Sequence, residues 1–313
     1  MPKFLTTCRR SATRTLLSGM LRLGGWLGPG GAIGLGRLLG GVCGFTGPLR
    51  KRLAANFRAA GIEPTKDLLD RYFQRLGLWA GWSLAVYEHG LERSGIVQRI
   101  EFANSLAYLD EAAAQGRGVI VAAPHFFAHE ITAAVAGRRH PFAALVRESK
   151  SAAHNDVKRH WYGALGMEMV HRARRSSMLA DAVALIRVLR SGRVLGITPD
   201  VLVPEDQGMP VTMFGRTVSL APGFAFLAMR SGAPVLTSHL EWLTPENPRE
   251  ARIRVHCHPP MRMPEGGNRE ALREAMQSWC SHYETLLRQN PENWLFWLDK
   301  NWTRVLQGSV TPS

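Results

Sequence analysis

The sequence predicts a single α/β domain in which helices flank a central sheet that is mostly parallel or mixed. Two observations support this fold class. Short apolar runs alternate with helical patterns from about residue 98 onwards, which is typical of a sheet covered by helices. The chain has 313 residues, 45% of them hydrophobic, and no linker divides its body. We therefore expect a basic amphipathic segment over residues 1–60 and an α/β domain over residues 61–313.

Cations are concentrated in the segment 1–60. It holds ten Lys or Arg and no Asp or Glu, in a chain whose formal net charge is +14. Apolar, glycine-rich sequence lies between these cations, and its longest uncharged run, Leu23 to Gly36, is 14 residues long. A membrane-spanning helix needs about 20 apolar residues. We therefore expect an amphipathic anchor that lies in the headgroup region of an anionic membrane. A true span, a signal sequence and an ordinary core helix are the alternatives.

The elements of the body follow in order. Thr65 is expected to cap a helix whose apolar stripe runs from Leu68 to Trp79 at helical spacing. Further helices are predicted at 104–115, 126–137, 153–165, 177–190, 224–230 and 268–289, and strands at 118–123, 142–147, 194–198, 234–241 and 252–257.

Several kinds of site lack support in the sequence. The four cysteines are scattered and form no CxxC pair, so they indicate neither a zinc site nor a disulfide framework. No G-x-S-x-G pattern occurs, which removes the nucleophile elbow of the serine hydrolases. Neither GxGxxG nor a Walker A pattern occurs, so nucleotide cofactors have no support. We expect neither a metal nor a cofactor.

The stretch Ala123–Glu130 carries the most chemistry. It lies where a buried strand gives way to a helix, which is where α/β sheets place ligand sites. His125 in the turn is expected to meet the Glu130 carboxylate, which would fix the imidazole tautomer and leave the other nitrogen to take a hydroxyl proton. His125 and Glu130 are thus the candidate catalytic pair. A helix-capping role for His125 and a metal site with His129 are the alternatives.

Charged residues also follow two other predicted strands. Arg147 ends one strand and Lys150 comes soon after it, while Asp200 follows another strand. The carboxyl ends of parallel strands share one edge of a sheet, so these side chains are expected near His125. Arg147, Lys150 and Asp200 are the candidate substrate-binding residues, and the two cations suit phosphate groups.

Taken in order, these blocks resemble the late acyltransferases of lipid A biosynthesis, the lauroyl and myristoyl transferases of Gram-negative inner membranes. The resemblance runs from Arg52–Asn56 through Gly116–Ile120 and the His125 and Glu130 block to Pro291–Trp297. It implies a fold like that of the glycerolipid acyltransferases and an acyl carrier protein thioester as donor. It further implies a Kdo-bearing lipid A precursor as acceptor, and an active site on the cytoplasmic face of the inner membrane.

The same resemblance implies direct acyl transfer, without an acyl-enzyme. Family members usually read H-x-G-N-W-E, where this chain has Phe127-Ala128-His129 before Glu130. The alternatives are an acyl-CoA donor and a different glycolipid or lysophospholipid acceptor. A basic nucleic-acid-binding protein is the alternative outside enzymes. It would spread its cations over one face of the body rather than gather them in an apolar N-terminal segment. We therefore expect no nucleic acid partner.

Overall fold

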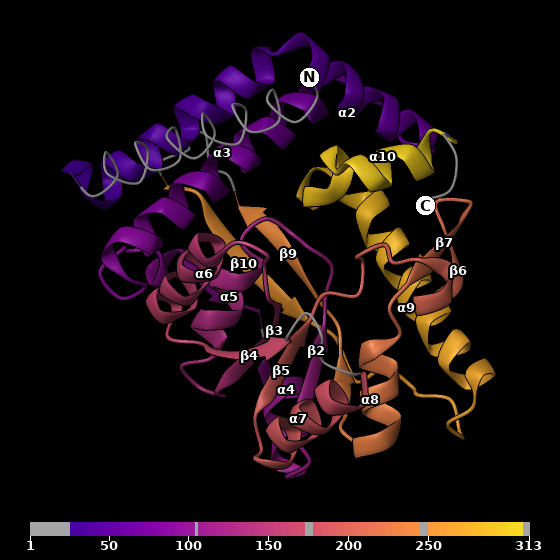
Figure 1. Cartoon of the computed structure of the whole chain (residues 1–313). Helices are drawn as coiled ribbons and strands as arrows, with labels where there is room; N and C mark the ends of the chain where they lie inside the picture. The colour runs from indigo at the N-terminus through magenta and orange to yellow at the C-terminus, as the bar shows by residue number, and fades with distance from the viewer. Residues whose placement is uncertain (1–25, 104–105, 173–177, 244–249, 309–313) are drawn as a thin grey trace.

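A computed structural model describes residues 26–103, 106–172, 178–243 and 250–308 (Figure 1). Its α-helices are Trp26–Phe45, α2 (Gly47–Ala59), α3 (Lys66–His89), α4 (Leu106–Ala114), α5 (His129–Ala136), α6 (Ala152–Leu165), α7 (Met178–Arg190), α8 (Gly223–Ser231), α9 (Arg269–Gln289) and α10 (Lys300–Leu306). Its strands are β1 (Ile100–Phe102), β2 (Val119–Ala122), β3 (Phe142–Arg147), β4 (Glu168–Arg172), β5 (Val194–Ile197), β6 (Met209–Met213), β7 (Arg216–Leu220), β8 (Val235–Leu236), β9 (Ser238–Leu243) and β10 (Arg252–Cys257). The part of the segment 1–60 before Trp26 lies outside the described residues.

The central sheet has five strands in the order β4-β3-β5-β2-β8, and its paired strands are all parallel. Parallel neighbours need crossover connections, which α5, α6 and α7 supply between β2, β3, β4 and β5. This confirms the predicted α/β class with a mostly parallel sheet flanked by helices. Since Ala122 lies opposite Ile197 in the register, the loops that follow β2 and β5 leave the sheet side by side.

A second sheet, in the order β1-β10-β9, packs beside the first. The predicted strand 234–241 is divided between the two sheets: β8 pairs with β2, and β9 pairs antiparallel with β10. The chain passes from one sheet to the other at Thr237, which is buried. The sequence does not show this break because its apolar run contains neither Gly nor Pro between β8 and β9.

Four strands are absent from the sequence prediction. β1 and β4 are short edge strands of five residues or fewer. β6 and β7 form a hairpin whose two-residue turn, Phe214–Gly215, has positive φ angles of 52° and 68°. Two consecutive positive φ angles give the turn whose twist matches paired antiparallel strands, and Gly adopts that conformation readily. The burial alternates along β6, as it does in a strand with one face on the core.

The N-terminal helix Trp26–Phe45 packs on α3 through glycines. A Cβ added at Gly36 would lie 2.2 Å from the backbone nitrogen of Gly81, and one added at Gly40 would lie 2.6 Å from the Cα of Gly77. Both helices therefore carry a Gly-xxx-Gly pair on the contacting face, which lets their backbones approach closely.

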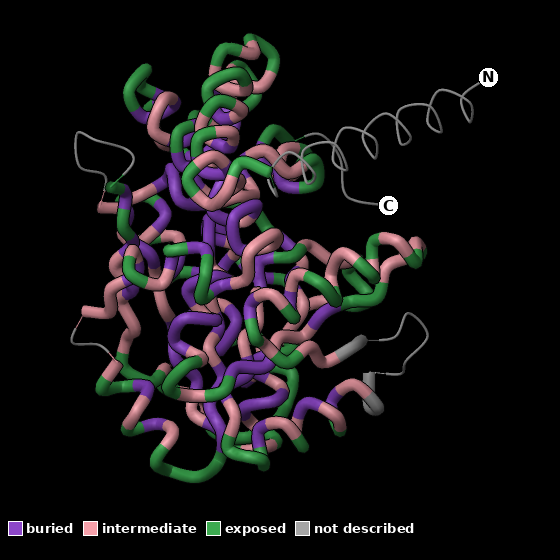
Figure 2. The backbone as a smooth tube through the Cα atoms, turned by 90° about the vertical axis from the view of Figure 1, so that its left-hand side faces the viewer, coloured by how far each residue is buried: buried purple, intermediate pink, exposed green. Residues whose placement is uncertain are grey.

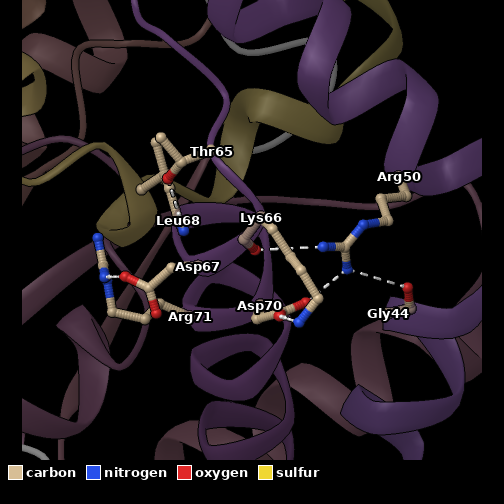
Figure 3. A network of polar contacts seen from close by, with 8 residues as sticks. All are labelled: Gly44, Arg50, Thr65, Lys66, Asp67, Leu68, Asp70 and Arg71. Atoms are coloured by element: carbon tan, nitrogen blue, oxygen red, sulfur yellow. Dashed lines mark hydrogen bonds and ion pairs between the residues drawn. The ribbon is translucent and has the colours of Figure 1, made fainter.

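The junction between α2 and α3 is fixed by polar contacts (Figure 3). The Thr65 hydroxyl accepts the backbone N–H of Leu68 at 3.2 Å, so the predicted helix cap is confirmed. Arg50 of α2 donates to the Asp70 carboxylate at 2.6 Å and to the carbonyl of Lys66 at 3.2 Å. These bonds set the direction in which α3 leaves α2.

Among the described residues, no single helix is long and apolar enough to cross a membrane. Trp26–Phe45 and α2, bent by 77° at their break, pass that test of length and composition only as a pair. The helix Trp26–Phe45 carries exposed apolar side chains, among which Trp26 is 93% exposed, Leu38 65% and Phe45 92%. Buried residues run through the middle of the body, and exposed residues are spread over its outside (Figure 2).

Candidate active site

His125 lies in the loop between β2 and α5. The helix begins at His129, three residues later than predicted, after Ala128 in a left-handed conformation with φ of 68°. Phe126 and Phe127 do not join the helix because their backbones pair with another part of the chain. Phe126 forms an antiparallel bridge with Trp294, and the Phe127 N–H donates to a neighbouring carbonyl at 3.0 Å. His125 therefore stands free of the helix, as predicted.

The carboxylate that meets His125 belongs to Asp200. The Nδ1 of His125 lies 2.7 Å from Oδ1 of Asp200, and the backbone N–H of His125 donates to Oδ2 at 2.8 Å. An ionised carboxylate can only accept, so Nδ1 carries the hydrogen and Nε2 is left as the basic nitrogen. Asp200 lies three residues after the end of β5 and is 0% exposed. The register between β2 and β5 brings the two residues together although 75 positions separate them.

Glu130 has different partners from the predicted ones. Its carboxylate accepts hydrogen bonds from the Trp161 indole at 2.8 Å and from the Tyr162 hydroxyl, both on α6. The first turn of α5 directs Glu130 towards α6, whereas His125 turns towards β5. The expected hydrogen bond from His125 to Glu130 is thus replaced by one to Asp200. Asp200 is predicted to bind substrate, but its side chain is fully buried beside His125 and is not among the residues that line the cavity described below.

Burial and charge compete at this pair. Burial disfavours the imidazolium, but the Asp200 carboxylate and, more weakly, Glu130 and Asp299 favour it, and together they hold the pKa of His125 above 6.5. Burial likewise opposes ionisation of Asp200, but His125 and the Trp294 N–H hold the pKa of its carboxyl below 3.8. The two groups are therefore a charged carboxylate beside an imidazole that accepts a proton readily.

His129 has a structural position. Its Nδ1 lies 2.8 Å from the carbonyl oxygen of Phe126, and its ring meets that of His125 edge to face. Burial lowers the pKa of His129 below 6.5. Within the described ranges, no group of three or more His, Cys, Asp or Glu side chains has an arrangement suited to a metal ion. The predicted metal independence stays a prediction.

A cavity of about 310 Å³ opens beside His125 and Glu130. Its walls come from α4, α5 and α6, from the central sheet and from the second sheet. Small residues and larger apolar residues share most of the lining: Ala133, Ala136, Ala144 and Gly196, then Leu106, Leu109, Phe142, Leu145, Met167, Leu240 and Val255. The cavity is therefore apolar along most of its wall and polar where the histidine stands.

Two cations line the same cavity. Arg147, at the end of β3, is exposed and belongs to the lining, as predicted from its strand-end position. Lys158 of α6 also lines the cavity, and its Nζ donates to the Arg147 carbonyl at 2.6 Å. The sequence gives no signal for Lys158 because its place depends on how α6 packs. Lys150 is exposed and is not among the lining residues.

The chain matches the model of the family described as bacterial lipid A biosynthesis acyltransferase over residues 66–304. The chain belongs to this family. The match spans β2, α5, β5 and the segment that follows α9, so it includes every residue of the site described above. It confirms the resemblance found in the sequence and makes the protein an acyltransferase of the lipid A biosynthesis type. No curated protein matches the chain.

Proposed function

We propose that this acyltransferase moves a fatty acyl group from an acyl carrier protein thioester to a hydroxyl of a lipid A precursor. The observation that carries the proposal is the His125–Asp200 pair at the polar end of an apolar cavity. A fixed tautomer supplies a base for the hydroxyl, and an apolar cavity suits a hydrocarbon chain. Because the chain belongs to the lipid A biosynthesis acyltransferases, we infer that the acceptor is a lipid A precursor.

The reaction follows from the tautomer. Nε2 of His125 accepts the proton of the acceptor hydroxyl while the hydroxyl oxygen attacks the thioester carbonyl carbon. A tetrahedral oxyanion forms. Collapse of that intermediate re-forms the carbonyl and breaks the carbon–sulfur bond. The departing thiolate takes the proton from His125, which restores the neutral imidazole. Asp200 stabilises the imidazolium between these two steps through the bond to Nδ1.

Glu130 keeps a catalytic place in this proposal, although it acts without a hydrogen bond to His125. Its carboxylate lines the cavity and raises the pKa of His125 through space. Trp161 and Tyr162 hold that carboxylate still, so its charge lies at a fixed position when the imidazolium forms. We assign Glu130 to electrostatic support of the transition state.

The other residues that line the cavity fall into two groups, one suited to the acyl chain and one suited to phosphate groups. The wall built from α5, β3 and β5 accepts the acyl chain, because it is apolar and its Ala and Gly residues leave room. Arg147 and Lys158 lie where a phosphate of the carrier's prosthetic group or of the acceptor can be bound. Lys150, exposed nearby, adds positive charge that suits an acidic carrier protein.

The N-terminal helix supports a place at a membrane. Its exposed Trp26, Leu38 and Phe45 offer apolar surface to lipid, and the segment 1–60 supplies ten cations without an acid. We propose the cytoplasmic face of the inner membrane as the site of action, because a carrier protein donor and a lipid acceptor meet there.

The deciding experiment is a transfer assay with purified protein in detergent. Radiolabelled acyl carrier protein thioester and a Kdo-bearing lipid A precursor are the substrates, and acylated lipid is the product measured. His125→Ala should lower turnover about 10²- to 10⁴-fold, which is the usual contribution of a positioned base. Parallel arms with acyl-CoA and with a lysophospholipid acceptor test the alternative substrates.

A matched control is present in the same chain. His140, which follows α5, lies 2.6 Å from Asp110 and forms a second histidine–aspartate pair that does not line the cavity. His140→Ala should leave acyl transfer close to that of the wild type. Near-normal turnover by His125→Ala would refute the proposed mechanism, and transfer from acyl-CoA alone would refute the proposed donor.

A further inference from the structure

The segment Pro291–Leu298, which follows α9, pairs with the loop that carries His125. The Leu295 N–H donates to the His125 carbonyl at 2.9 Å, and the Phe127 N–H donates to the Asn293 carbonyl at 3.0 Å. Phe126 and Trp294 form the antiparallel bridge between these two bonds. The catalytic loop thus has a backbone partner some 170 residues away along the chain.

This segment is itself fixed from behind by α2 and α3. The amide of Asn56 donates to the Trp297 carbonyl at 2.6 Å, and the Tyr72 hydroxyl donates to the Leu295 carbonyl at 3.2 Å. Arg75, which is 7% exposed, binds Glu292 at 3.1 Å and also contacts Asn293. A rigid support therefore holds the side chains that the segment presents to the site.

The indole of Trp294 touches the carboxylate partner of the base. Its Nε1–H donates to Oδ2 of Asp200 at 2.8 Å, the oxygen that also accepts the backbone N–H of His125. Trp294 and Asp200 are both 0% exposed. Because water does not reach this carboxylate, the indole N–H replaces part of its solvation.

Phe296, two residues after Trp294, contacts the base itself. The ring of Phe296 stacks on that of His125, with centroids 4.4 Å apart and planes 26° apart. A side chain stacked on one face restricts rotation of the imidazole about its bond to the Cβ atom. Trp294 and Phe296 thus act on the two members of one pair from a single segment.

We propose that Trp294 is a positioning residue for His125, acting through Asp200, and that Phe296 holds the imidazole in the plane this requires. The inference rests on the proposed function. With the indole bond in place, Asp200 remains ionised and aimed at Nδ1, so Nε2 faces the substrate as a base of fixed basicity. The segment after α9 therefore supplies two residues, Trp294 and Phe296, that position the catalytic pair.

Other ionisable groups also face the pair and set its baseline. The groups that interact with His125 are Glu130 and His129 of α5, and Asp299, the residue before α10. The groups that interact with Asp200 are Cys280 and Tyr283 of α9. None of them is changed by a substitution at position 294. A shift caused by that substitution therefore reports the indole bond.

The direction of the shift follows from the charges. When His125 is neutral, the Asp200 anion depends on its N–H donors, and when His125 is protonated the imidazolium supports the anion as well. Loss of the indole N–H thus destabilises the neutral-imidazole state more. Trp294→Phe should raise the pKa of His125 by about one pH unit, since a charge-assisted hydrogen bond is lost in part.

The test measures that pKa directly. The full chain is labelled at histidine and titrated by NMR in detergent, with the His125 signal assigned from its absence in His125→Asn. The control is Trp297→Phe, because Trp297 is equally buried but its indole donates to the Pro291 carbonyl. A second variant carries benzothienylalanine at position 294, which replaces the ring N–H by sulfur and keeps the bicyclic shape.

We expect both changes at position 294 to raise the pKa of His125. The acid limb of the pH profile of kcat/KM should move to higher pH by the same amount. Trp297→Phe should lower the melting temperature and leave both values in place. Equal shifts in the two tryptophan variants, or no shift with benzothienylalanine, would overturn the inference. If His125→Ala stayed active while position 294 still controlled the pKa of His125, the proposed function would fail and this positioning role would stand.

Discussion

At the scale of single residues, the site depends on which carboxylate reaches which nitrogen. The sequence places His125 in the turn after a strand, and this placement is correct. The sequence also identifies Asp200 as a carboxylate at the end of a strand, but the short spacing between His125 and Glu130 favours Glu130 as the hydrogen-bond partner of His125. The choice depends on the register between β2 and β5 and on the direction of the first turn of α5, neither of which a local pattern contains.

Asp200 should control stability as a function of pH. Its folded pKa is lowered, so it contributes stability above about pH 3.8 that is lost as the pH falls through the folded value. The folded pKa of His125 is raised, so its contribution is complete below about pH 6.5 and is lost as the pH rises through the folded value. The pair therefore stabilises the fold most between these two limits.

Asp200→Asn tests this window. Removing one partner of a buried ion pair costs about 3 kcal/mol, so we expect the largest loss of unfolding free energy near pH 5. At higher pH the loss should become smaller, because His125 gives up its proton as the pH rises through its raised folded pKa. Denaturant unfolding of the variant and the wild type near pH 5 and at higher pH provides the measurement, with Asp110→Asn as the control at a half-buried histidine pair. A loss that did not depend on pH would contradict the assignment of charges.

At the scale of elements, the sequence predicts the helices from α3 to α9 and the strands β2, β3 and β5 well because their apolar patterns are clear, but it misses α10 and the edge strands β1 and β4. It does not separate β8 from β9, and it misses the β6–β7 hairpin. The pattern around Thr237, with Val235 and Leu236 before it and Leu240 after Ser238 and His239, is equally compatible with one strand or with two strands in different sheets. The segment Pro291–Leu298 shows no period at all, since it forms two short 3₁₀ turns whose aromatic side chains pack in several directions.

The contact between the helix Trp26–Phe45 and α3 gives a prediction for glycine. A Cβ at Gly36 would lie 2.2 Å from the Gly81 backbone nitrogen, whereas a Cβ at Gly41 would meet nothing within 4 Å. Gly36→Ala should therefore separate the helices and cost about 1–3 kcal/mol through overpacking. Gly41→Ala, in the same helix, should be neutral or stabilise by up to about 1 kcal/mol because alanine favours the helix.

Thermal unfolding in one detergent compares the two variants directly. If Gly41→Ala were the more harmful change, the two helices would not pack through the Gly36 face. Equal melting temperatures for both variants would show that this contact contributes little to stability.

At the scale of the whole molecule, the exposed apolar helix and the cationic start predict two separable forces. Salt weakens the attraction of Lys and Arg to anionic lipid, since the Debye length falls to about 3 Å at 1 M. Burial of Trp26 and Phe45 in lipid gains about 25 cal/mol per Å² that salt does not screen. We expect 1 M salt to leave most of the protein on membranes and detergent to release it, as followed by sedimentation.

Substitutions on the same helix sharpen this prediction. Replacing Trp26, Val42 and Phe45 by Asn should allow salt to release the protein, while replacing the same three residues by Leu should not. Full release of the wild-type chain by salt alone would contradict insertion of this helix.

The distance along the chain between the members of the site has a consequence for biosynthesis. His125, Asp200 and Trp294 leave the ribosome in that order, and about 10–30 s of elongation separate the first from the last. The helix Trp26–Phe45, which we propose faces lipid, precedes all three. A nascent chain can thus bind the proposed membrane surface and form its central sheet before Trp294 has been synthesised. We therefore expect a chain truncated before Trp294 to bind the membrane but to lack the indole N–H that sets the pKa of His125 through Asp200.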